Sequence, residues 1–539
     1  MTLFGLALRS HLGGFGATAF IGLLLGVANT LAYVQIAGTD TASRALFARQ
    51  MEIVGRQLSY FLPLPAELDT MAGFVQWRLF GAAPLIYAFW PLLAGSGAGR
   101  GDEERGLVEA WLAAGVSRVR YIVTRCVAFL LVATVTVAAL ILATWVGSIA
   151  AGEGIALAPL ALQGLDLLAL AAVSFAFTVL IAQLTTTRRS AGGIAGIALM
   201  ALFLVNSASR SGGMEAIAPL SPFWQYDRSV PLRSAGTLDA GAIGILFGAT
   251  AVLLIVAILA FRARDLGASL LRTAPREGRR KLTPSGDPFL RLGVLALLDQ
   301  QRYWILGWTI GLGALAVFLT SLTRLMVDSL FAMPGLRVFF ERLGSSGYDS
   351  FVGVIWGATA PLLLSLFAIF QVSAWVADDA EGRLEAALAQ PISRTRVVLE
   401  RLASVVLATL LVAAVGAVAV WVTAARVDIP LSADRFVPGS ALMVTVPLAF
   451  GAIGAVVSSW RPRAAVSFLT VVAIVGYFTQ QFAALFQWPQ WVEDTSIYAL
   501  YGTPIATGVE WGGIVTLLAI ALAGGALGLV LFQRRDVGR

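Results

Sequence analysis

Apolar residues follow one another along this chain in long stretches that are separated by short polar segments. A stretch of about 17 to 25 apolar residues with few charges forms a helix long enough to cross the hydrocarbon core of a bilayer. The pattern therefore predicts an all-α integral membrane protein with about twelve spans. The spans are expected near residues 14–36, 73–98, 120–149, 159–184, 190–207, 239–262, 303–325, 352–377, 397–425, 436–460, 464–484 and 511–532.

Composition supports the membrane class. The 539 residues are 58% hydrophobic and 13% charged, whereas a soluble domain carries about 25% charged residues. The first span is followed by no small-residue cleavage site and belongs to a pattern that recurs later in the chain. We therefore expect it to be retained and not removed as a signal peptide.

The positions of the basic residues predict the orientation, because Lys and Arg concentrate on the cytoplasmic side of a membrane. With the amino terminus inside, the inner segments carry most of the 38 Lys and Arg. Both termini are then cytoplasmic, and the use of a single lysine in an Ala- and Gly-rich chain favours a bacterial cell membrane. The net charge of +7 reflects this bias and points to anionic lipid headgroups as a partner, with no nucleic acid.

Rare residue types exclude several kinds of chemistry. Cys126 is the only cysteine and His11 the only histidine, so one chain holds no disulfide, no Cys/His metal site and no Cys/His catalytic pair. A phosphate-binding Walker loop ends in Gly-Lys followed by Ser or Thr. The only lysine, Lys281, lies between Arg280 and Leu282. We therefore expect no catalytic, cofactor or metal site, and no ATPase activity, in this chain.

Two charged segments repeat without a gap at an offset of 276 residues. Residues 105–125 read RGLVEAWLAAGVSRVRYIVTR, and residues 381–401 read EGRLEAALAQPISRTRVVLER. Each copy lies between the second and third spans of a six-span unit. An even number of spans places two such units in the same orientation. The chain is thus predicted to be a tandem of two parallel six-span repeats.

Other segments extend the repeat. FVQWRLFGAAPL at 74–85 parallels FVGVIWGATAPL at 351–362, and FRARDLG at 261–267 parallels FQRRDVG at 532–538. The predicted domains are a first half at 1–262, a basic cytoplasmic linker at 263–301 and a second half at 302–539. The end of the linker, FLRLGVLALLDQQ at 289–301, is amphipathic. It forms either a helix in the inner membrane interface or a simple flank of the seventh span.

The duplicated segment has the pattern of a short amphipathic helix. In the second copy Glu381 and Glu385 share one helix face, and Leu384 shares another with Leu388. Pro391 is expected to end this helix and Ser393 to cap the next one. In the first copy, Gly115 and Ser117 take these two places.

Acidic residues recur in the segment as well. Asp102, Glu103 and Glu109 return as Asp378, Asp379 and Glu385. Topological anchoring explains basic residues such as Arg118 and Arg394, but acidic residues contribute little to topology. We therefore expect a soluble protein to contact the short helix from the cytoplasm. The alternative is a loop that carries positive-inside anchors and nothing more.

The order E-G-R-L-E-A-A-L-A-Q-P-I-S-R, placed between the second and third spans, resembles the coupling-helix segment of type-2 ABC exporter permeases. The tandem arrangement, RARDLGASLLR after the sixth span and LSPFWQYDRSVPL at 220–232 resemble the branch of polyketide-antibiotic, tetronasin-type exporters. The resemblance implies efflux of hydrophobic or amphipathic compounds, with ATP and magnesium bound by a separate ATPase, two copies per permease chain. It assigns coupling to Asp102, Glu103, Glu109, Ser117, Arg118, Asp378, Asp379, Glu381, Glu385, Pro391, Ser393 and Arg394.

The first copy departs from this pattern. It has Arg105 where the second copy has Glu381, and Gly115 where the second copy has Pro391. The two coupling helices are therefore not expected to be equivalent.

An ion-coupled secondary multidrug transporter is the alternative function, because that class also favours twelve spans in two halves. Such a protein usually keeps ionisable residues within its spans, and Asp166 is the clearest intramembrane acid here. The loop between the second and third spans lacks the Gly-rich, Asp-Arg signature of the major facilitator class. A membrane enzyme would need a His, Cys or acid cluster that the spans lack, and the coupling segment argues against a scaffold or channel.

The substrate pathway is expected between the halves, lined by residues that are unfavourable in lipid. For each candidate, hydrogen bonding between helices or a position near the interface is the favoured alternative. No residue identifies the exported compound. The pathway candidates are Asn29, Arg78, Asp166, Gln371 and Gln480.

Overall fold

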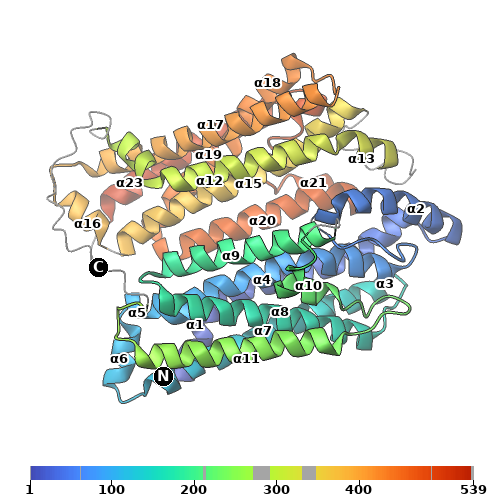
Figure 1. Ribbon diagram of the computed structural model, residues 1–539. Helices are drawn as coiled ribbons and strands as arrows, with labels where there is room; N and C mark the ends of the chain where they lie inside the picture. Colours follow the sequence, from blue (N-terminus) through green and yellow to red (C-terminus); the bar gives the residue numbers. More distant parts are fainter. Residues whose placement is uncertain are drawn as a thin grey trace. The chain divides into compact units, whose positions relative to one another are not determined.

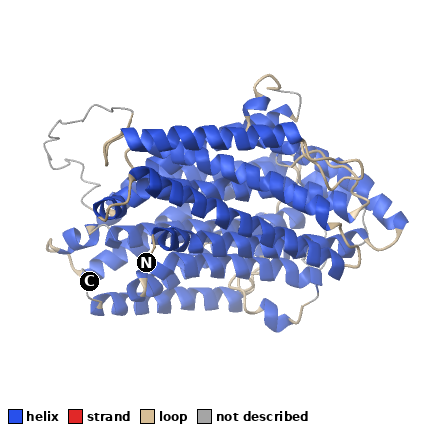
Figure 2. Ribbon diagram, turned by 90° about the horizontal axis from the view of Figure 1, so that it is seen from below, coloured by secondary structure: helices blue, strands red, loops and turns tan. Residues whose placement is uncertain are grey.

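The computed structural model describes residues 2–60, 62–210, 214–270, 292–330, 347–380, 382–486 and 488–535. Within these ranges the regular structure is entirely helical (Figure 2). Among the described residues, twelve helices are long and apolar enough to cross a membrane. Each coincides with one of the spans predicted from the sequence, so the predicted all-α membrane architecture is confirmed.

The chain divides into two compact units, Met1–Arg280 and Lys281–Arg539. The division falls within the predicted linker, of which residues 271–291 lie outside the described ranges. The amphipathic residues from Gly293 onward continue without a break into the seventh span. Within the described residues, that part of the linker therefore forms the first turns of α12.

Unit 1 contains the first six spans of the chain (Figure 1). The second span contains two π-helical turns, η2 and η3. Turns of this kind occur mostly as single insertions within an α-helix, and often at functional sites. The spans are α1 (Leu3–Ala37), α3 to α5 (Met71–Phe74, η2 Val75–Leu79, α4 Phe80–Ser96, η3 Gly97–Gly101, α5 Asp102–Glu104), α7 (Arg118–Ala150), α8 (Leu157–Leu184), α9 (Arg188–Ser209) and α11 (Ala240–Ala263).

Unit 2 repeats this order. Its fourth span is broken into two helices, α18 and α19, whereas the equivalent α8 is continuous. Pro438 lies inside α18 and Pro447 in the first turn of α19, where each proline removes a backbone N–H from the helix. The spans are α12 (Gly293–Ser321), α15 (Tyr348–Ala380), α17 (Arg394–Arg426), α18 (Ala433–Leu442) with α19 (Thr445–Trp460), α20 (Pro462–Phe486) and α23 (Trp511–Arg534).

The same helix pairs pack together in both units. In unit 1, α1 lies along α7 and α8 lies between α4 and α11; in unit 2, α12 lies along α17 and α19 lies between α15 and α23. Glycine permits the close α1–α7 contact, since a Cβ atom at Gly26 would come within 2.9 Å of the Thr144 backbone nitrogen. Small residues allow such close approach between helices in a membrane. The structure therefore repeats the tandem pattern seen in the sequence.

Short helices occupy the two ends of each unit. Each coupling segment forms one of them: α6 (Leu107–Ala113) in unit 1 and α16 (Arg383–Leu388) in unit 2. In each unit the coupling segment lies at the opposite end from the short helices that follow the first span, α2 (Thr41–Gln57) and α13 (Thr323–Leu330) (Figure 1). The remaining short helices are η1 (Leu58–Tyr60), η4 (Ala218–Leu220), α10 (Pro222–Asp227), α21 (Gln490–Glu493) and α22 (Pro504–Thr507).

Candidate functional site

A glycine precedes each coupling helix, and a serine caps the span that follows it. α6 follows Gly106 (φ 67°), and α16 follows Gly382 (φ 71°). Glycine adopts this left-handed backbone without steric cost, so each chain can turn sharply out of the preceding span. The hydroxyls of Ser117 and Ser393 accept the backbone N–H of the third residue of the next helix, at 3.3 and 3.2 Å. Both predicted serine caps are confirmed.

The ends of the coupling helices differ between the copies. Gly115 (φ 84°) follows Ala114, the C-cap of α6, and ends the helix, as expected. α16 ends at Leu388, three residues before Pro391, so the proline lies in the connection and does not stop the helix itself. Glu381 lies outside the described residues.

Asp102 is the centre of a buried group of polar side chains at the base of α6. Its carboxylate accepts the Tyr121 hydroxyl at 2.9 Å and lies 2.8 Å from the guanidinium nitrogen of Arg125. Arg105 adds a third contact at 2.8 Å. The side chains of Asp102 and Arg125 are only 1% and 2% exposed. These contacts join the end of the second span to the start of the third.

Glu103, the next residue, holds two further arginines. It lies 2.7 Å from Arg100 on η3 and also pairs with Arg264, which follows α11. All three side chains are buried. Arg264 also donates to the Gln183 side chain at the end of α8. We call Arg100, Asp102, Glu103, Tyr121, Arg125 and Arg264 the first anchor cluster.

Unit 2 has an equivalent group. Asp378 lies 2.7 Å from Arg383 and 3.5 Å from Arg401, while Asp379 pairs with Arg535. Asp378, Asp379 and Arg401 lie 276 positions after Asp102, Glu103 and Arg125, and Arg535 takes the place of Arg264 in the repeated FxxRDxG ending. We call Asp378, Asp379, Arg383, Arg401 and Arg535 the second anchor cluster.

Arg118 and Arg394 each bind the carboxyl end of the last span of their own unit, α11 and α23. Arg118 donates to the backbone oxygens of Arg262 and Arg264, at 3.3 and 2.6 Å. Arg394 donates to those of Gln533 and Arg535, at 2.9 and 2.7 Å. A cation is unfavourable at the amino end of its own helix but favourable at the carboxyl end of another. This pairing explains the repeated arginine.

An apolar contact completes each coupling segment. Val108 on α6 is buried in one cluster with Ile122 and Phe261. The residues equivalent to these in unit 2, Leu384, Val398 and Phe532, form their own cluster. Each short helix is therefore fixed on its inner face by apolar packing and at its base by ion pairs, which are buried in unit 1 and partly exposed in unit 2.

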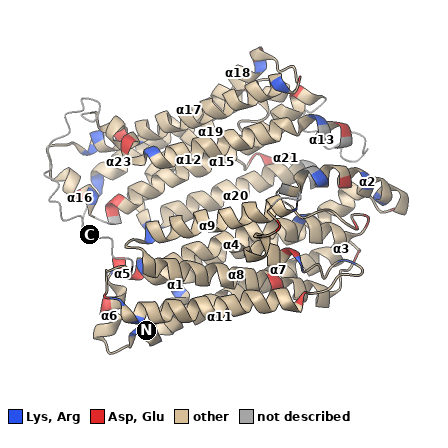
Figure 3. Cartoon of the chain, viewed as in Figure 1, with Lys and Arg blue, Asp and Glu red and all other residues tan. Residues whose placement is uncertain are grey.

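The structure assigns the predicted coupling acids to two different places. Asp102 and Glu103 are buried, and Asp378 and Asp379 are mostly buried, all in ion pairs within their own units. These four support the coupling helix through ion pairs within their own unit. Glu109 and Glu385, in contrast, are exposed on α6 and α16. Figure 3 shows charged residues gathered at the ends of each unit, with few along the spans.

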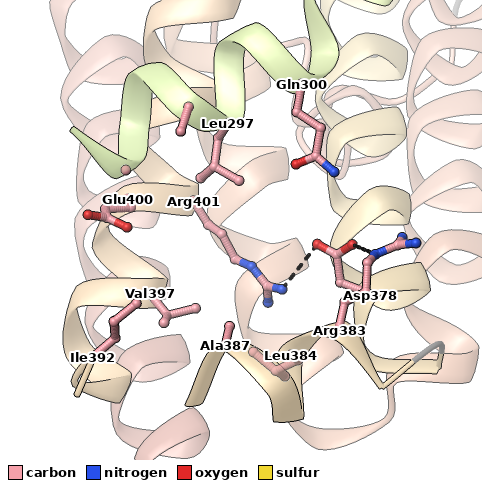
Figure 4. Close-up of a pocket in the computed structure, with 12 residues that line it drawn as sticks. Leu297, Gln300, Asp378, Arg383, Leu384, Ala387, Ile392, Val397, Glu400 and Arg401 are labelled. Carbon is pink, nitrogen blue, oxygen red and sulfur yellow. Dashed lines mark hydrogen bonds and ion pairs between the residues drawn. The ribbon is translucent and has the colours of Figure 1, made fainter. Parts of the chain in front are cut away.

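The second anchor cluster is more open than the first. Asp378 and Arg401 are 20% and 12% exposed, and a cavity of about 270 Å³ lies beside them between the starts of α12 and α17 and the helix α16 (Figure 4). Val397 lines this cavity, where the first copy has the fully buried Tyr121. The smaller side chain leaves the space and removes one hydrogen bond to the acid.

Two variants, each with the residue of the other copy, test this difference in packing between the anchor clusters. Tyr121→Val should lower the free energy of unfolding by about 2–4 kcal/mol, because it creates a cavity and removes one of the buried donors to Asp102. Val397→Tyr should change stability by less than about 1.5 kcal/mol, since the cavity accepts part of the ring. Denaturation of the purified chain by SDS titration measures both. A Tyr121→Val chain as stable as the wild type would show that the first anchor cluster is not held as described.

Sequence reasoning missed the arginines and the tyrosine that hold the acids. Arg264 and Arg535 stood in the repeated endings of the sixth and twelfth spans, and Arg125 and Arg401 stood at the 276-residue offset. The repeat itself was therefore a usable signal for these four. Tyr121 and Arg100 have no counterpart in the second copy, so the repeat could not have shown them.

The five pathway candidates are divided between the two units, with Asn29, Arg78 and Asp166 in unit 1 and Gln371 and Gln480 in unit 2. Asn29 donates to Leu25 O of its own helix at 2.9 Å, and the exposed Arg78 lies over the Phe74 ring at 5.6 Å. Gln480 on α20 is half-buried. None of the five candidates lines the cavities of about 270, 500 and 480 Å³ that lie within the described part of unit 2.

Asp166 and Gln371 are the two candidates that are completely buried. Neither oxygen of Asp166 and neither polar atom of Gln371 makes a hydrogen bond of normal geometry with a described residue. Ser229 is the polar side chain next to Asp166. Near it, Gln163 joins Gln76 and Tyr226 in a buried network, with both contacts at 2.9 Å.

Comparison with known proteins finds a similarity for the second half of the chain. Residues 293–533 match the family model described as the C-terminal domain of the multidrug efflux system permease Rv1217c. No curated protein matches the chain significantly. The matched range begins with α12 and includes all of the second anchor cluster except Arg535. The second half of this chain is therefore similar to a permease domain of the multidrug efflux type.

Proposed function

We propose that this protein is the membrane subunit of an ATP-driven ABC exporter, energised by a separate ATPase that contacts α6 and α16. The observation that carries the proposal is the repeated anchor cluster. In each half it fixes a short helix to the ends of three spans, while the outer face of that helix, with Glu109 or Glu385, stays exposed. A soluble partner that pushes on such a helix moves the spans with it.

The ion pairs make this connection stiff. In unit 1, Glu103 joins the second span to Arg264 beyond the sixth, and Asp102 joins it to Arg125 on the third. Removing one partner of a buried ion pair is strongly destabilising, so the three ends move together more easily than apart. Displacement of α6 would thus reach α4, α7 and α11 at once.

The exported compounds are hydrophobic or amphipathic, in keeping with the multidrug efflux domain. Energy comes from the partner, which would bind ATP and magnesium, because the only lysine of this chain is not in a Walker loop. Two coupling helices in one chain provide places for two ATPase copies. We expect no labelling of the purified chain by an azido analogue of ATP. Specific labelling would contradict the proposal that ATP binds only to the separate ATPase.

The proposed site requires both coupling helices to face the cytoplasm of a bacterial cell. Cysteine replacements at Glu109 and Glu385, in a Cys126→Ser background, should react with a membrane-impermeant maleimide in inverted vesicles and not in intact cells. Asp69→Cys, in the exposed connection before the second span, is the control that should react from outside. Labelling of position 109 or 385 from outside intact cells would invalidate the orientation.

Asp166 offers a test of the ion-coupled alternative, because an acid buried within a span is a feature of proton relays. In an exporter driven by ATP, this carboxyl has no proton to carry. Asp166→Asn should then keep ATP-driven transport close to the wild-type rate in reconstituted vesicles. Loss of transport in a variant that folds normally would favour the secondary transporter.

A further inference from the structure

A groove of about 480 Å³ lies between α17 and the broken fourth span of unit 2. Ala413 and Ala417 lie on one side of it, and Trp421 and Phe436, with ring centroids 5.5 Å apart, stand together in its wall. Its rim is open, since Val418 is 61% exposed. Pockets that hold drug-sized ligands are about 300–1,000 Å³ and mostly apolar. The groove has this size and character.

One polar atom interrupts the apolar lining. The Ser440 hydroxyl is buried and makes no hydrogen bond with any described residue. A serine within a helix can bond to the carbonyl one turn earlier, as Ser459 does to Ala455 O at 2.7 Å. Ser440 does not use this bond, although an unpaired hydroxyl in an apolar environment is unfavourable. Its hydroxyl is available to a molecule in the groove.

The first half shows the same place filled. Val137, Ile141 and Gly164 stand 276 positions before Ala413, Ala417 and Ser440. A Cβ atom at Gly164 would come within 2.9 Å of Ile141 and 3.3 Å of Val137, so α7 and α8 are in close contact there. In unit 2 alanine replaces both large side chains, and the fourth span is broken between Leu442 and Thr445. The groove therefore belongs to the second half and is not a general feature of the repeat.

We propose that this groove binds the exported compound from the membrane: an apolar, aromatic molecule of drug size with one hydrogen-bonding group that pairs with Ser440. This deepens the proposed export function and rests on it. A lipid acyl chain is the other molecule that could enter from the membrane. Its hydrocarbon part has no hydrogen-bonding group and would leave Ser440 unpaired, whereas an aromatic amine or alcohol satisfies the hydroxyl and stacks on Trp421.

Binding of N-phenyl-1-naphthylamine, an apolar aromatic amine whose fluorescence rises on binding, tests the groove in the purified full-length chain in phosphatidylcholine nanodiscs. Ala413→Val with Ala417→Ile rebuilds the packing of the first half and should weaken binding at least about tenfold. Ser440→Ala should weaken it about two- to tenfold, the loss of one hydrogen bond. Val422→Ile, which enlarges an exposed side chain of α17 outside the groove, should leave it unchanged. Unchanged affinity in the double variant, when it is as stable as the wild type, would overturn the proposal.

A second measurement separates the compound from lipid. A phosphatidylcholine with a diazirine in its acyl chain should label the groove less when N-phenyl-1-naphthylamine is present. If the lipid labels the groove and the amine does not compete, the groove is a lipid site and the proposal fails.

The binding assay contains neither ATP nor ATPase, so its outcome is independent of the proposed export function. Groove binding without ATP-driven transport would reject the export function and leave the groove in place. ATP-driven transport of the amine at equal rates by wild type and double variant would reject the groove and leave the export function in place.

Discussion

Glu103→Gln should lower the free energy of unfolding by about 3–5 kcal/mol, because it leaves two buried guanidinium groups without a counter-charge. Arg100 and Arg264 both pair with this one carboxylate, and their side chains are 1% and 2% exposed. The amide keeps the shape of the side chain, so the loss reports charge and not volume. SDS titration of the purified chain, with the expression level in membranes as a second measure, gives the result.

The second half supplies the matched control. Asp379→Asn removes the equivalent acid. Among the described residues, however, Asp379 forms an ion pair with one arginine, Arg535, which is 20% exposed. Partly exposed ion pairs contribute about 0–1 kcal/mol, so this variant should cost little. Equal losses in the two variants would show that burial and the second arginine do not set the energy of the first anchor cluster.

Reversal of the exposed acids, Glu109→Arg together with Glu385→Arg, should abolish ATPase docking and uncouple ATP hydrolysis from transport. A partner surface arranged for an acid would meet a cation, and like charges across an interface can cost several kcal/mol. Both side chains are exposed on their short helices, so the fold should be unaffected, with a stability change within about 0.5 kcal/mol. Pull-down of the ATPase and drug-stimulated ATP hydrolysis in reconstituted membranes measure the effect.

The single reversals are expected to differ. Glu385→Arg lies on the segment whose anchor cluster is more open, and Glu109→Arg on the segment that departs from the coupling-helix pattern at Arg105 and Gly115. We expect the stronger loss from Glu385→Arg. Normal docking and coupling in the double reversal would return both segments to loops with topological anchors.

The spans and the repeat could be predicted from the sequence because both depend on local properties of the chain. Hydropathy and length determine whether a helix can span a membrane, and the cap positions of Ser117 and Ser393 follow from nearby residues. The break between α18 and α19 had its signal in Pro438 and Pro447, within a stretch that otherwise reads as one span.

The role of the acids could not be predicted in the same way. Glu103 and Glu109 are both acids of one charged segment, yet Glu103 is buried and Glu109 is exposed. The difference depends on Arg264, which is 161 positions from Glu103 and reaches it only in the folded unit. The groove at Ser440 likewise depends on which side chain of α17 lies opposite it. Such contacts are determined by packing between distant segments.

Transport in proteoliposomes tests the central claim most directly. The purified chain, reconstituted with and without its ATPase, would be assayed for uptake of N-phenyl-1-naphthylamine into vesicles whose coupling helices face the added ATP. We predict uptake only when the ATPase and hydrolysable ATP with magnesium are both present, and no uptake by the chain alone under an imposed proton gradient. Uptake by the chain alone, driven by the proton gradient without ATP, would contradict the account and identify a secondary transporter.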